Sequence, residues 1–327
     1  MIDMWLVYLL RLMDIPVDPI VAKAPRGLLP IEPIVAKAPR GLLPIELHQL
    51  ILSHADFLSQ IRLRCVCKLF HTKLEVNDFL NIGDYWIDLT DEILQSYLFI
   101  THLDAFDNPK ITDVNHLTRL TVLKANVANM GEECGINDKG IANLFNLTEL
   151  NAGDNPGITN INHMTRLEKL NARFKCGIND MGISKLNLKR LNADWNERIT
   201  NINHMTNLEI LYANGYSSIN NNSIQNLNLK ELRCNHNNKI TNINHMTNLK
   251  ILYCADYVCG IDDHSLREMN LIELYAGNNS KITNINHMTQ LEILGATDGC
   301  GIADAGIRNL KLKKLYSKHN DKITIKN

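Results

Sequence analysis

The chain has 327 residues, of which 45% are hydrophobic and 21% are charged, a composition typical of a folded protein that buries a real core and not of a disordered chain. Lys and Arg number 34 against 35 Asp and Glu, so the formal net charge is −1. This balance excludes a general electrostatic attraction to nucleic acid or to an anionic membrane, and we expect neither as a partner.

Residues 1–42 contain a short apolar run and a tandem duplication. The run from Met4 to Leu10 is too short to span a bilayer and lacks the basic start of a secretory signal, so we expect an amphipathic or partner-bound segment. The sequence PIVAKAPRGLLPIE then occurs twice, from Pro19 to Glu32 and from Pro33 to Glu46. Its many prolines predict an extended, flexible segment.

Residues 43–80 predict a small all-α domain, because apolar residues recur at helix-like intervals after Leu43. Pro44 suits the first turn of a helix, and Glu46 then lies near the positive helix end. The segment resembles the F-box in three places: Leu43-Pro44-x-Glu46-Leu47, Ile51-Leu52 and Arg64-Cys65-Val66-Cys67-Lys68-x-Phe70.

The F-box resemblance implies a three-helix unit that inserts its Leu-Pro end and apolar side chains into a Skp-type adaptor. The adaptor-binding residues that it implies here are Leu43, Pro44, Leu47, Ile51, Leu52, Leu58 and Val66. A second interpretation stays open. The same helices could serve as a cap that shields the first repeat from water, as the terminal units of repeat proteins must be shielded.

Residues 81–327 contain a long repeat. A nearly constant text, ITNINHMTxLxxL, begins at Ile158, Ile199, Ile240 and Ile282, in steps of 41, 41 and 42 residues. Such periods predict a solenoid in which each unit buries its apolar edge against its neighbours. Each period has two related halves, and Leu147-x-x-Leu150-x-Ala152-x-x-Asn155 in the first half matches the leucine-rich-repeat pattern. We therefore expect a curved α/β solenoid with about eleven parallel strands.

The two halves of a period differ in their polar positions. A buried Asn in the first half would bond backbone groups where each strand leaves the sheet. This Asn recurs at Asn108, Asn155, Asn196, Asn237, Asn279 and Asn320. The alternate half lacks it, and the run Ile178, Ile183 and Leu186 predicts a short helix on the outer wall. A surplus after Ala125 predicts a surface loop, which either contacts a ligand or is merely tolerated.

Two rows of side chains could suggest disulfides or metal sites. Their members lie two turns apart, about 9.6 Å, which is too far for a disulfide or for ligands of one ion. The rows are Cys134, Cys176, Cys259 and Cys300, and His116, His163, His204, His245 and His287. We expect reduced, buried thiols, typical of the cytoplasm or nucleus, and histidines at a repeated turn.

No chemistry-bearing motif is found. Cys65, Cys67 and His71 offer at most two ligands on one helix face, too few for a structural zinc site. The G-x-S-x-G, P-loop, GxGxxG and HExxH motifs are all missing, so we expect no catalytic residue, no metal and no cofactor.

The concave strands offer the candidate binding site, because the side chains between the buried Leu and Ala positions do not pack in the core. Tyr and Arg collect there, and these residues often carry binding energy. The client-binding candidates are Arg173, Arg190, Tyr212, Arg233, Tyr253, Tyr275 and Tyr316. The alternative is that aromatic and β-branched residues only stabilise the sheet by cross-strand pairing.

An F-box followed by leucine-rich repeats resembles the substrate receptors of SCF-type ubiquitin ligases, including the large set carried by giant DNA viruses. The resemblance implies a Skp-type adaptor, a cullin ligase and a client protein as partners, a cytoplasmic or nuclear location, and, in a virus, redirection of the host's degradation machinery. The alternative is a free-standing recognition scaffold or decoy whose F-box binds no adaptor.

Overall fold

A computed structural model describes residues 44–53, 60–61, 64, 70, 73–80, 82, 88–128 and 134–324, without the side chains of Ile51 and Ser53. The described residues fall into two compact units, Met1–Leu147 (unit 1) and Thr148–Asn327 (unit 2). The apolar run at Met4–Leu10 and nearly all of the tandem duplication lie outside the described residues, as does the centre of the loop after Ala125.

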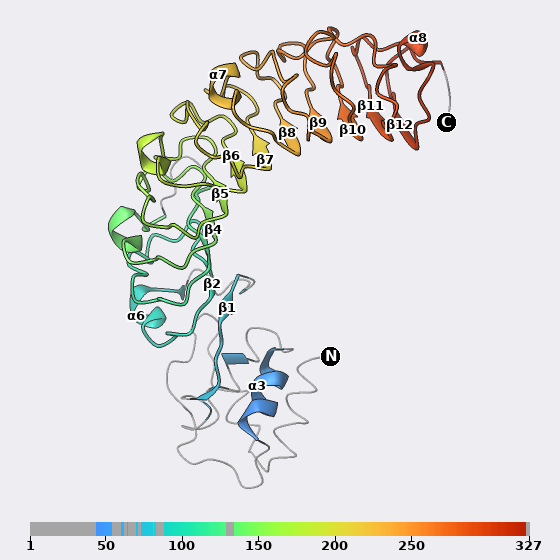
Figure 1. The fold of residues 1–327 in the computed structure, drawn as a ribbon. Coiled ribbons are helices and arrows are strands. Elements are labelled where there is room, and N and C mark those ends of the chain that lie inside the picture. Colours follow the sequence, from blue (N-terminus) through green and yellow to red (C-terminus); the bar gives the residue numbers. More distant parts are fainter. Residues whose placement is uncertain are drawn as a thin grey trace. The chain divides into compact units, whose positions relative to one another are not determined.

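Unit 1 combines helical and repeat segments (Figure 1). Its elements are α3 (Ile45–Ser53), β1 (Asp78–Phe79), α6 (Asp91–Leu94), β2 (His102–Asp104), β3 (Val122–Lys124) and the 3₁₀ helix η2 (Asp138–Ile141). Strands β1, β2 and β3 pair in parallel in chain order. Gln49 joins α3 to the first repeat, since its side chain donates to the Glu75 carbonyl at 2.9 Å and accepts from the Glu75 N–H at 2.7 Å.

Unit 2 is a parallel solenoid whose strands line the inner side of a curve, with short helical turns on the outer side (Figure 1). Its strands are β4 (Glu149–Asn151), β5 (Lys169–Asn171), β6 (Arg190–Asn192), β7 (Ile210–Tyr212), β8 (Glu231–Arg233), β9 (Ile251–Tyr253), β10 (Glu273–Tyr275), β11 (Ile293–Gly295) and β12 (Lys314–Tyr316). The helical turns are η3 (Met181–Ile183), α7 (Asn221–Ile224) and α8 (Asp304–Ile307). Each strand pairs in parallel with the next.

The three-residue strands follow directly from the LxxLxL frame. In an extended strand alternate side chains point to opposite faces, so the central Leu of each strand points inward and its two neighbours point to the concave face. The central leucines of neighbouring strands lie in register, as Leu191 does with Leu211 and Leu211 with Leu232. All three are fully buried, and their stacked column forms the solenoid core.

The predicted Asn row is confirmed as a buried hydrogen-bond ladder. Asn237 is 1% exposed, and its Nδ2 donates to the carbonyls of Ala213 at 2.9 Å and Ile219 at 3.2 Å. Its Oδ1 accepts from the N–H of Lys239 at 2.8 Å. Asn279 and Asn320 repeat the same contacts. One amide therefore pairs backbone groups of two turns that would otherwise be buried without partners.

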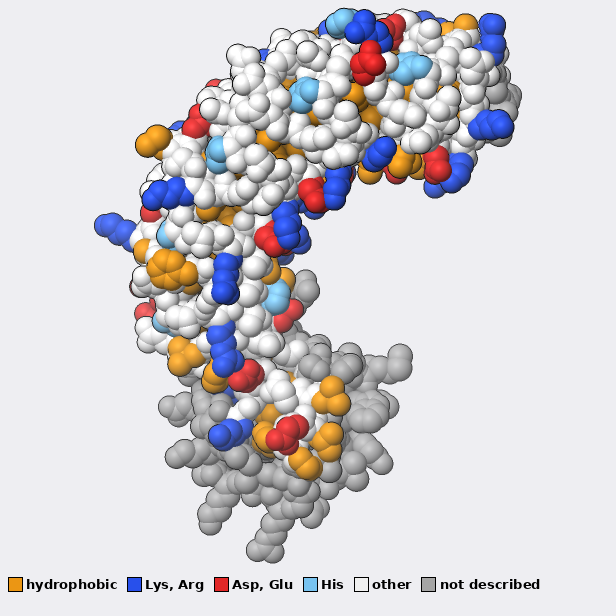
Figure 2. Space-filling model, in the orientation of Figure 1, with side chains coloured by type: hydrophobic (Ala, Val, Ile, Leu, Met, Phe, Trp, Pro, Cys, Tyr) orange, Lys and Arg blue, Asp and Glu red, His pale blue; other side chains and the backbone are white. Residues whose placement is uncertain are grey.

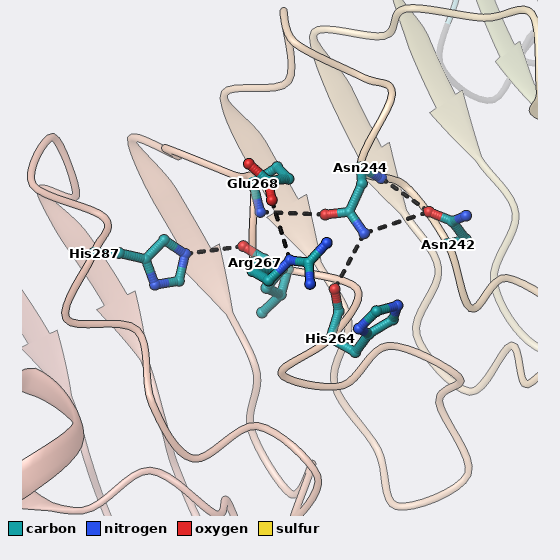
Figure 3. Close-up of polar contacts among 7 residues, drawn as sticks. Asn242, Asn244, His264, Arg267, Glu268 and His287 are labelled. Atoms are coloured by element: carbon teal, nitrogen blue, oxygen red, sulfur yellow. Dashed lines mark hydrogen bonds and ion pairs between the residues drawn. The ribbon is translucent and has the colours of Figure 1, made fainter.

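The predicted outer-wall helices are present as short helical turns, and side chains tie them to the neighbouring turns. Figure 3 shows one such clamp: the Asn244 carboxamide donates to the His264 carbonyl at 3.1 Å and accepts from the Glu268 N–H at 3.2 Å. An acidic residue makes a second link, since Asp180 accepts from the N–H and the hydroxyl of Thr200. These bonds replace a regular helix as the means of fixing the outer wall.

Twelve strands occur in the described residues, where the sequence predicted eleven. All eleven predicted strands are present, and the additional one is β1. It was missed because Asp78 and Phe79 carry no LxxLxL frame. The strand is fixed instead by burial of Phe79, whose ring meets Tyr97 edge-on with centroids 5.2 Å apart.

Candidate interaction surfaces

The first candidate surface lies on α3 in unit 1. Pro44 directly precedes the helix, and its carbonyl accepts from the N–H groups of Leu47 and His48, so it starts the helix as predicted. Pro44 is exposed, Leu47 is 44% exposed and Leu50 is 57% exposed. Residues three apart share one face of a helix, so these three side chains form a single apolar strip open to solvent.

The opposite side of α3 is buried. Leu52 is 1% exposed, and the ring of His48 packs against Phe70 with centroids 4.7 Å apart. In this arrangement Leu52 contributes to the interior, so it differs from the exposed residues of the strip. Leu43, Leu58 and Val66 and the side chain of Ile51 lie outside the described residues, as do Cys65, Cys67 and His71.

Arg64 connects the helical segment to the first repeat of unit 1. Its guanidinium lies 4.5 Å from the centroid of the Tyr97 ring, and Nη2 donates to the Ser96 carbonyl at 3.0 Å. Since the residue is only 7% exposed, the cation is buried with both a hydrogen-bond acceptor and a π face beside it. The helical segment is thus packed on the repeat, which would also satisfy the capping interpretation.

The second candidate surface is a continuous row of side chains on strands β6–β10 of unit 2. We call Arg190, Tyr212, Arg233, Tyr253 and Tyr275 the Arg–Tyr row. The Arg233 guanidinium lies 4.3 Å from the ring centroids of both Tyr212 and Tyr253, so it is sandwiched between two aromatic faces. Tyr253 stacks on Tyr275 at 4.3 Å with an interplanar angle of 8°. Arg190 begins the row, with its Nη2 2.9 Å from the Tyr212 hydroxyl.

Carboxylates beside the row fix its polar groups. Nε of Arg233 donates to Glu231 at 2.7 Å. Partial burial lowers the pKa of Arg233, but this bond and the nearby negative charge outweigh it and leave the pKa raised, so the guanidinium stays charged. The Tyr275 hydroxyl donates to Glu273 at 2.9 Å, and burial together with this bond raises the pKa of Tyr275. The row therefore presents three aromatic rings and two guanidinium cations, each with a defined partner.

Two predicted client-binding residues lie apart from this row. Arg173 follows β5, and its guanidinium lies 5.3 Å from the Phe174 ring instead of facing the row. Tyr316 is half-exposed on β12 and is separated from Tyr275 by Gly295. A Cβ on Gly295 would lie 3.0 Å from Tyr275 Cδ1, so the glycine makes room for that ring.

Ion pairs border the concave side of unit 2. Lys169 pairs with Glu149 at 3.1 Å across β4 and β5, and further Lys–Glu pairs join residues that directly precede neighbouring strands. The further pairs are Lys189–Glu168, Lys230–Glu209 and Lys313–Glu292. Figure 2 shows Lys and Arg side chains beside Asp and Glu along this margin. Exposed pairs of this kind contribute little to stability, and they give the margin no net charge.

Three histidines of the row contact a backbone carbonyl of the preceding turn, whereas the Nε2 of His116 is buried without a hydrogen-bond partner. His287 Nε2 lies 2.9 Å from the Leu266 carbonyl (Figure 3), and His245 and His204 make the equivalent contact one and two periods earlier. Cys176, Cys259 and Cys300 are buried and Cys134 is partly buried; burial raises the pKa of Cys134 to about 11. Within the described ranges, no group of three or more His, Cys, Asp or Glu side chains is placed to hold a metal ion.

Three features of these surfaces were not predicted. Leu50 is more exposed than Leu47, and its spacing of three from Leu47 was the available signal. Cys234 and Cys254 lie in adjacent turns beside Cys259, outside the Cys-Gly-Ile row. Asp194 is partly buried within electrostatic reach of Arg233 and Arg173, and this burial raises its pKa although the two charges oppose the shift. The last two depend on contacts across turns.

Comparison with known proteins adds one domain assignment. A family model described as F-box domain matches residues 42–81. No curated protein matches the chain. In the part of the chain that the structure describes, no helix is both long enough and apolar enough to cross a bilayer.

Several solved structures are similar to this chain at low identity. An internalin, inlF, of Listeria monocytogenes is 20% identical, with 72% of this chain and 85% of that chain covered and a TM-score of 0.47. The functional domain of InlJ from Listeria monocytogenes is 18% identical, with 69% and 55% covered and a TM-score of 0.37. A leucine-rich-repeat protein of Leptospira interrogans is 14% identical, with 75% and 78% covered and a TM-score of 0.37.

The molecule is therefore a repeat protein: a parallel solenoid with an aromatic and cationic row on its concave strands. Its N-terminal part is an F-box domain, so the chain fits an F-box/leucine-rich-repeat protein. Both kinds of module are typically non-catalytic and bind other proteins.

Proposed function

We propose that this protein is a non-catalytic substrate receptor of an SCF-type ubiquitin ligase. The F-box binds a Skp-type adaptor and, through it, a cullin ligase, while the concave strands of the solenoid bind a client protein for ubiquitin transfer by other subunits. The observation that carries the proposal is the F-box match at residues 42–81 in a chain that continues as a leucine-rich-repeat solenoid. Such a receptor works in the cytoplasm or nucleus.

The α3 strip supports the adaptor half of the proposal. Pro44, Leu47 and Leu50 place an apolar face in solvent at the start of the F-box, and exposed apolar strips of this kind mark sites of protein contact. A helix that served only as a cap would keep its apolar residues against the repeat. The other contact residues that the F-box resemblance implies, Leu43, Ile51, Leu58 and Val66, remain predictions for this interface, and so does Leu52, although its side chain is buried here.

Co-precipitation with a Skp-type adaptor tests this half. We expect the parent chain to capture the adaptor and a Pro44→Ala/Leu47→Ala/Leu50→Ala variant to lose capture. Phe145→Ala is the matched control, because Phe145 is a 54% exposed apolar side chain in the repeats of unit 1. Equal capture by the triple variant and the parent, or no capture by either, would favour the scaffold or decoy.

The Arg–Tyr row supports the client half. Tyr and Arg give large contact area with a polar handle, and their fixed stacking lowers the entropy lost on binding. Proximity labelling in cells should enrich one set of proteins with the parent and lose it with Tyr253→Ala/Tyr275→Ala. The Phe145→Ala variant should keep that set. If the double variant retains every labelled protein, the Arg–Tyr row only stabilises the sheet and does not bind the client.

A further inference from the structure

A second cluster of aromatic side chains follows the strands of unit 2 and shares no residue with the Arg–Tyr row. We call Phe174, Trp195, Tyr216, His236 and Tyr257 the edge aromatics. Trp195 stacks near Phe174 at 6.4 Å and near His236 at 6.0 Å, and Tyr216 meets Trp195 edge-on at 5.2 Å. His236 meets Tyr257 edge-on at 6.4 Å, which extends the cluster by one more turn.

The edge aromatics are exposed and, in part, strained. Phe174 and Trp195 are each 40% exposed, Tyr216 60% and Tyr257 64%. Phe174 and Trp195 also have φ of 54° and 56°, a left-handed backbone that costs a bulky residue about 1–2 kcal/mol. The equivalent positions of other turns carry residues that tolerate this backbone: Asp154, Asn278 and Asp298. Core packing cannot explain aromatic rings that are held in strain and left in solvent, so a surface role explains them better.

Lysines lie on the loops that alternate with those of the tyrosines: Lys239 follows β8 and Lys281 follows β10, whereas Tyr216 follows β7 and Tyr257 follows β9. Lys239 donates through Nζ to the Ser217 carbonyl at 3.1 Å, and Lys281 donates to the Cys259 carbonyl at 2.8 Å. These bonds anchor each exposed ammonium at an equivalent place two turns apart. An ammonium has three donors, so each lysine keeps two for another acceptor. Lys322 repeats the contact at the Cys300 carbonyl, at 3.3 Å.

The spacing of these cations matches an extended polypeptide. Two turns of the solenoid separate Lys239 from Lys281 by about 9.6 Å. About three residues of an extended chain cover the same length, roughly 9.3–10 Å. A carboxylate at every third residue could therefore meet successive lysines, while the side chains between them contact Tyr216 and Tyr257.

We propose that the loops carrying the edge aromatics and Lys239 and Lys281 bind an extended, acidic polypeptide segment with a carboxylate at about every third residue and apolar side chains between. This surface is separate from the concave row of the proposed function. It would contribute a second contact, either to the same client or to a regulatory protein.

Carboxylates within the cluster argue against a nucleic acid as the occupant. Asp256 pairs with His236 at 3.2 Å, and Asp154, Asp194 and Asp298 lie at the same edge. A nucleic acid carries a negative charge at every nucleotide, so its phosphates would be repelled by these aspartates. A peptide whose carboxylates are spaced apart can avoid them. Aromatic rings and cations together would otherwise also suit single-stranded RNA.

Fluorescence anisotropy with the full-length protein, in the absence of adaptor, tests the proposal. The probe is a labelled peptide that repeats Glu-Leu-Pro, and the comparison peptide has the same composition with its glutamates in one block. We expect binding of the spaced peptide to weaken about tenfold in Lys239→Met/Lys281→Met, as two exposed ion pairs predict. Lys189→Met/Lys230→Met is the matched control, since these lysines already pair with glutamates on the concave margin.

Three outcomes would overturn the proposal: no binding of the spaced peptide, equal affinity for the blocked peptide, or tighter binding of a single-stranded RNA of equal length. Thermal unfolding curves that match the parent's show that each variant is folded. A second variant, Tyr216→Ala/Tyr257→Ala, should also bind the spaced peptide more weakly than the parent. Unchanged affinity would contradict a role of the edge aromatics in binding. Because no adaptor is present, failure here leaves the adaptor test unaffected, and the reverse holds too.

Discussion

The indole of Trp195 lies over the backbone of Gly215 in the next turn. A Cβ on Gly215 would lie 2.3 Å from Trp195 Cε2 and 2.7 Å from Cζ2, closer than real Cβ contacts come. Gly215 also has φ of 67°, which an L side chain rarely adopts. The glycine is therefore the structural condition for the placement of Trp195, and through it for the edge aromatics.

Substitution of this glycine should be costly. We expect Gly215→Ala to lower the free energy of unfolding by about 2 kcal/mol or more, from backbone strain and overlap with a ring. Urea unfolding followed by far-UV circular dichroism measures the loss. Gly153→Ala is the control, because its Cβ would meet only side-chain atoms, chiefly of the flexible Arg173 and then Oδ1 of Asn151, and its φ is not positive. Equal losses for the two variants would contradict the explanation.

Removal of one Asn from the buried ladder should destabilise unit 2. Asn237→Ala leaves the carbonyls of Ala213 and Ile219 and the N–H of Lys239 without their partner, so we expect a loss of about 3 kcal/mol. Asn238→Ala changes the exposed neighbour and should stay within about 0.5 kcal/mol of the parent. Denaturant unfolding of both variants under one set of conditions gives the comparison, and a loss below about 1 kcal/mol for Asn237→Ala would show that water replaces the amide.

Two leucines of α3 should separate folding from adaptor binding. Leu52 is buried, so Leu52→Ala should cost about 2–4 kcal/mol of stability. Leu50 is exposed, so Leu50→Ala should leave the unfolding curve nearly unchanged while it weakens adaptor capture. Urea titration and a pull-down on the same preparations measure both effects. A stable Leu52→Ala variant, or an unstable Leu50→Ala variant, would mean that the helix faces are assigned the wrong way round.

Asp194 should make stability depend on pH. Its pKa is raised, chiefly by burial, while bonds to Asn214 and the charges of Arg233 and Arg173 oppose the shift. The folded state therefore holds the proton more tightly than the unfolded state, whose Asp pKa is about 3.9. The stabilising contribution of Asp194 is present below pH about 4 and falls as the pH rises through the folded pKa.

Asp194→Asn removes this titration. Asn fits the position, because Asn214 and Asn235 occupy it in the next two turns and accept the same backbone bond. We expect the variant to be more stable than the parent at pH 7, with the difference lost near pH 4. Urea unfolding at the two pH values checks the sign, with the exposed Asp298→Asn as control. A variant less stable than the parent at pH 7 would mean that attraction to the two arginines outweighs burial.

Much of the fold follows from sequence, because one frame recurs at a fixed period. The frame alone places the buried leucines, the Asn ladder and the strands from β2 onward. It could not place β1, since a strand of two residues held by Phe79 and Tyr97 depends on tertiary packing. Nor could it identify the links of the outer wall, such as Asp180 with Thr200, whose partners lie about one turn apart in unrelated positions of the frame.

The interaction surfaces were predicted less completely. The frame shows that Tyr212, Arg233 and Tyr253 share a face, but only coordinates show Arg233 between two rings. The edge aromatics were missed because they follow the strands, where the frame allows any residue. Backbone φ is the property that singles out Phe174 and Trp195, and a sequence pattern does not contain it.

The link between Asp180 and Thr200 has a consequence for how the gene can change length. The same bond joins Asp263 to Thr283 and Asp304 to Thr324, and an Asn takes the acidic position in the bond from Asn221 to Thr241. The threonine that donates and the Asp or Asn that accepts thus recur with the 41-residue repeat. Unequal recombination that adds or deletes whole repeats would create junctions in which these hydrogen bonds still form. The number of repeats can therefore change without new residues having to evolve at the junction.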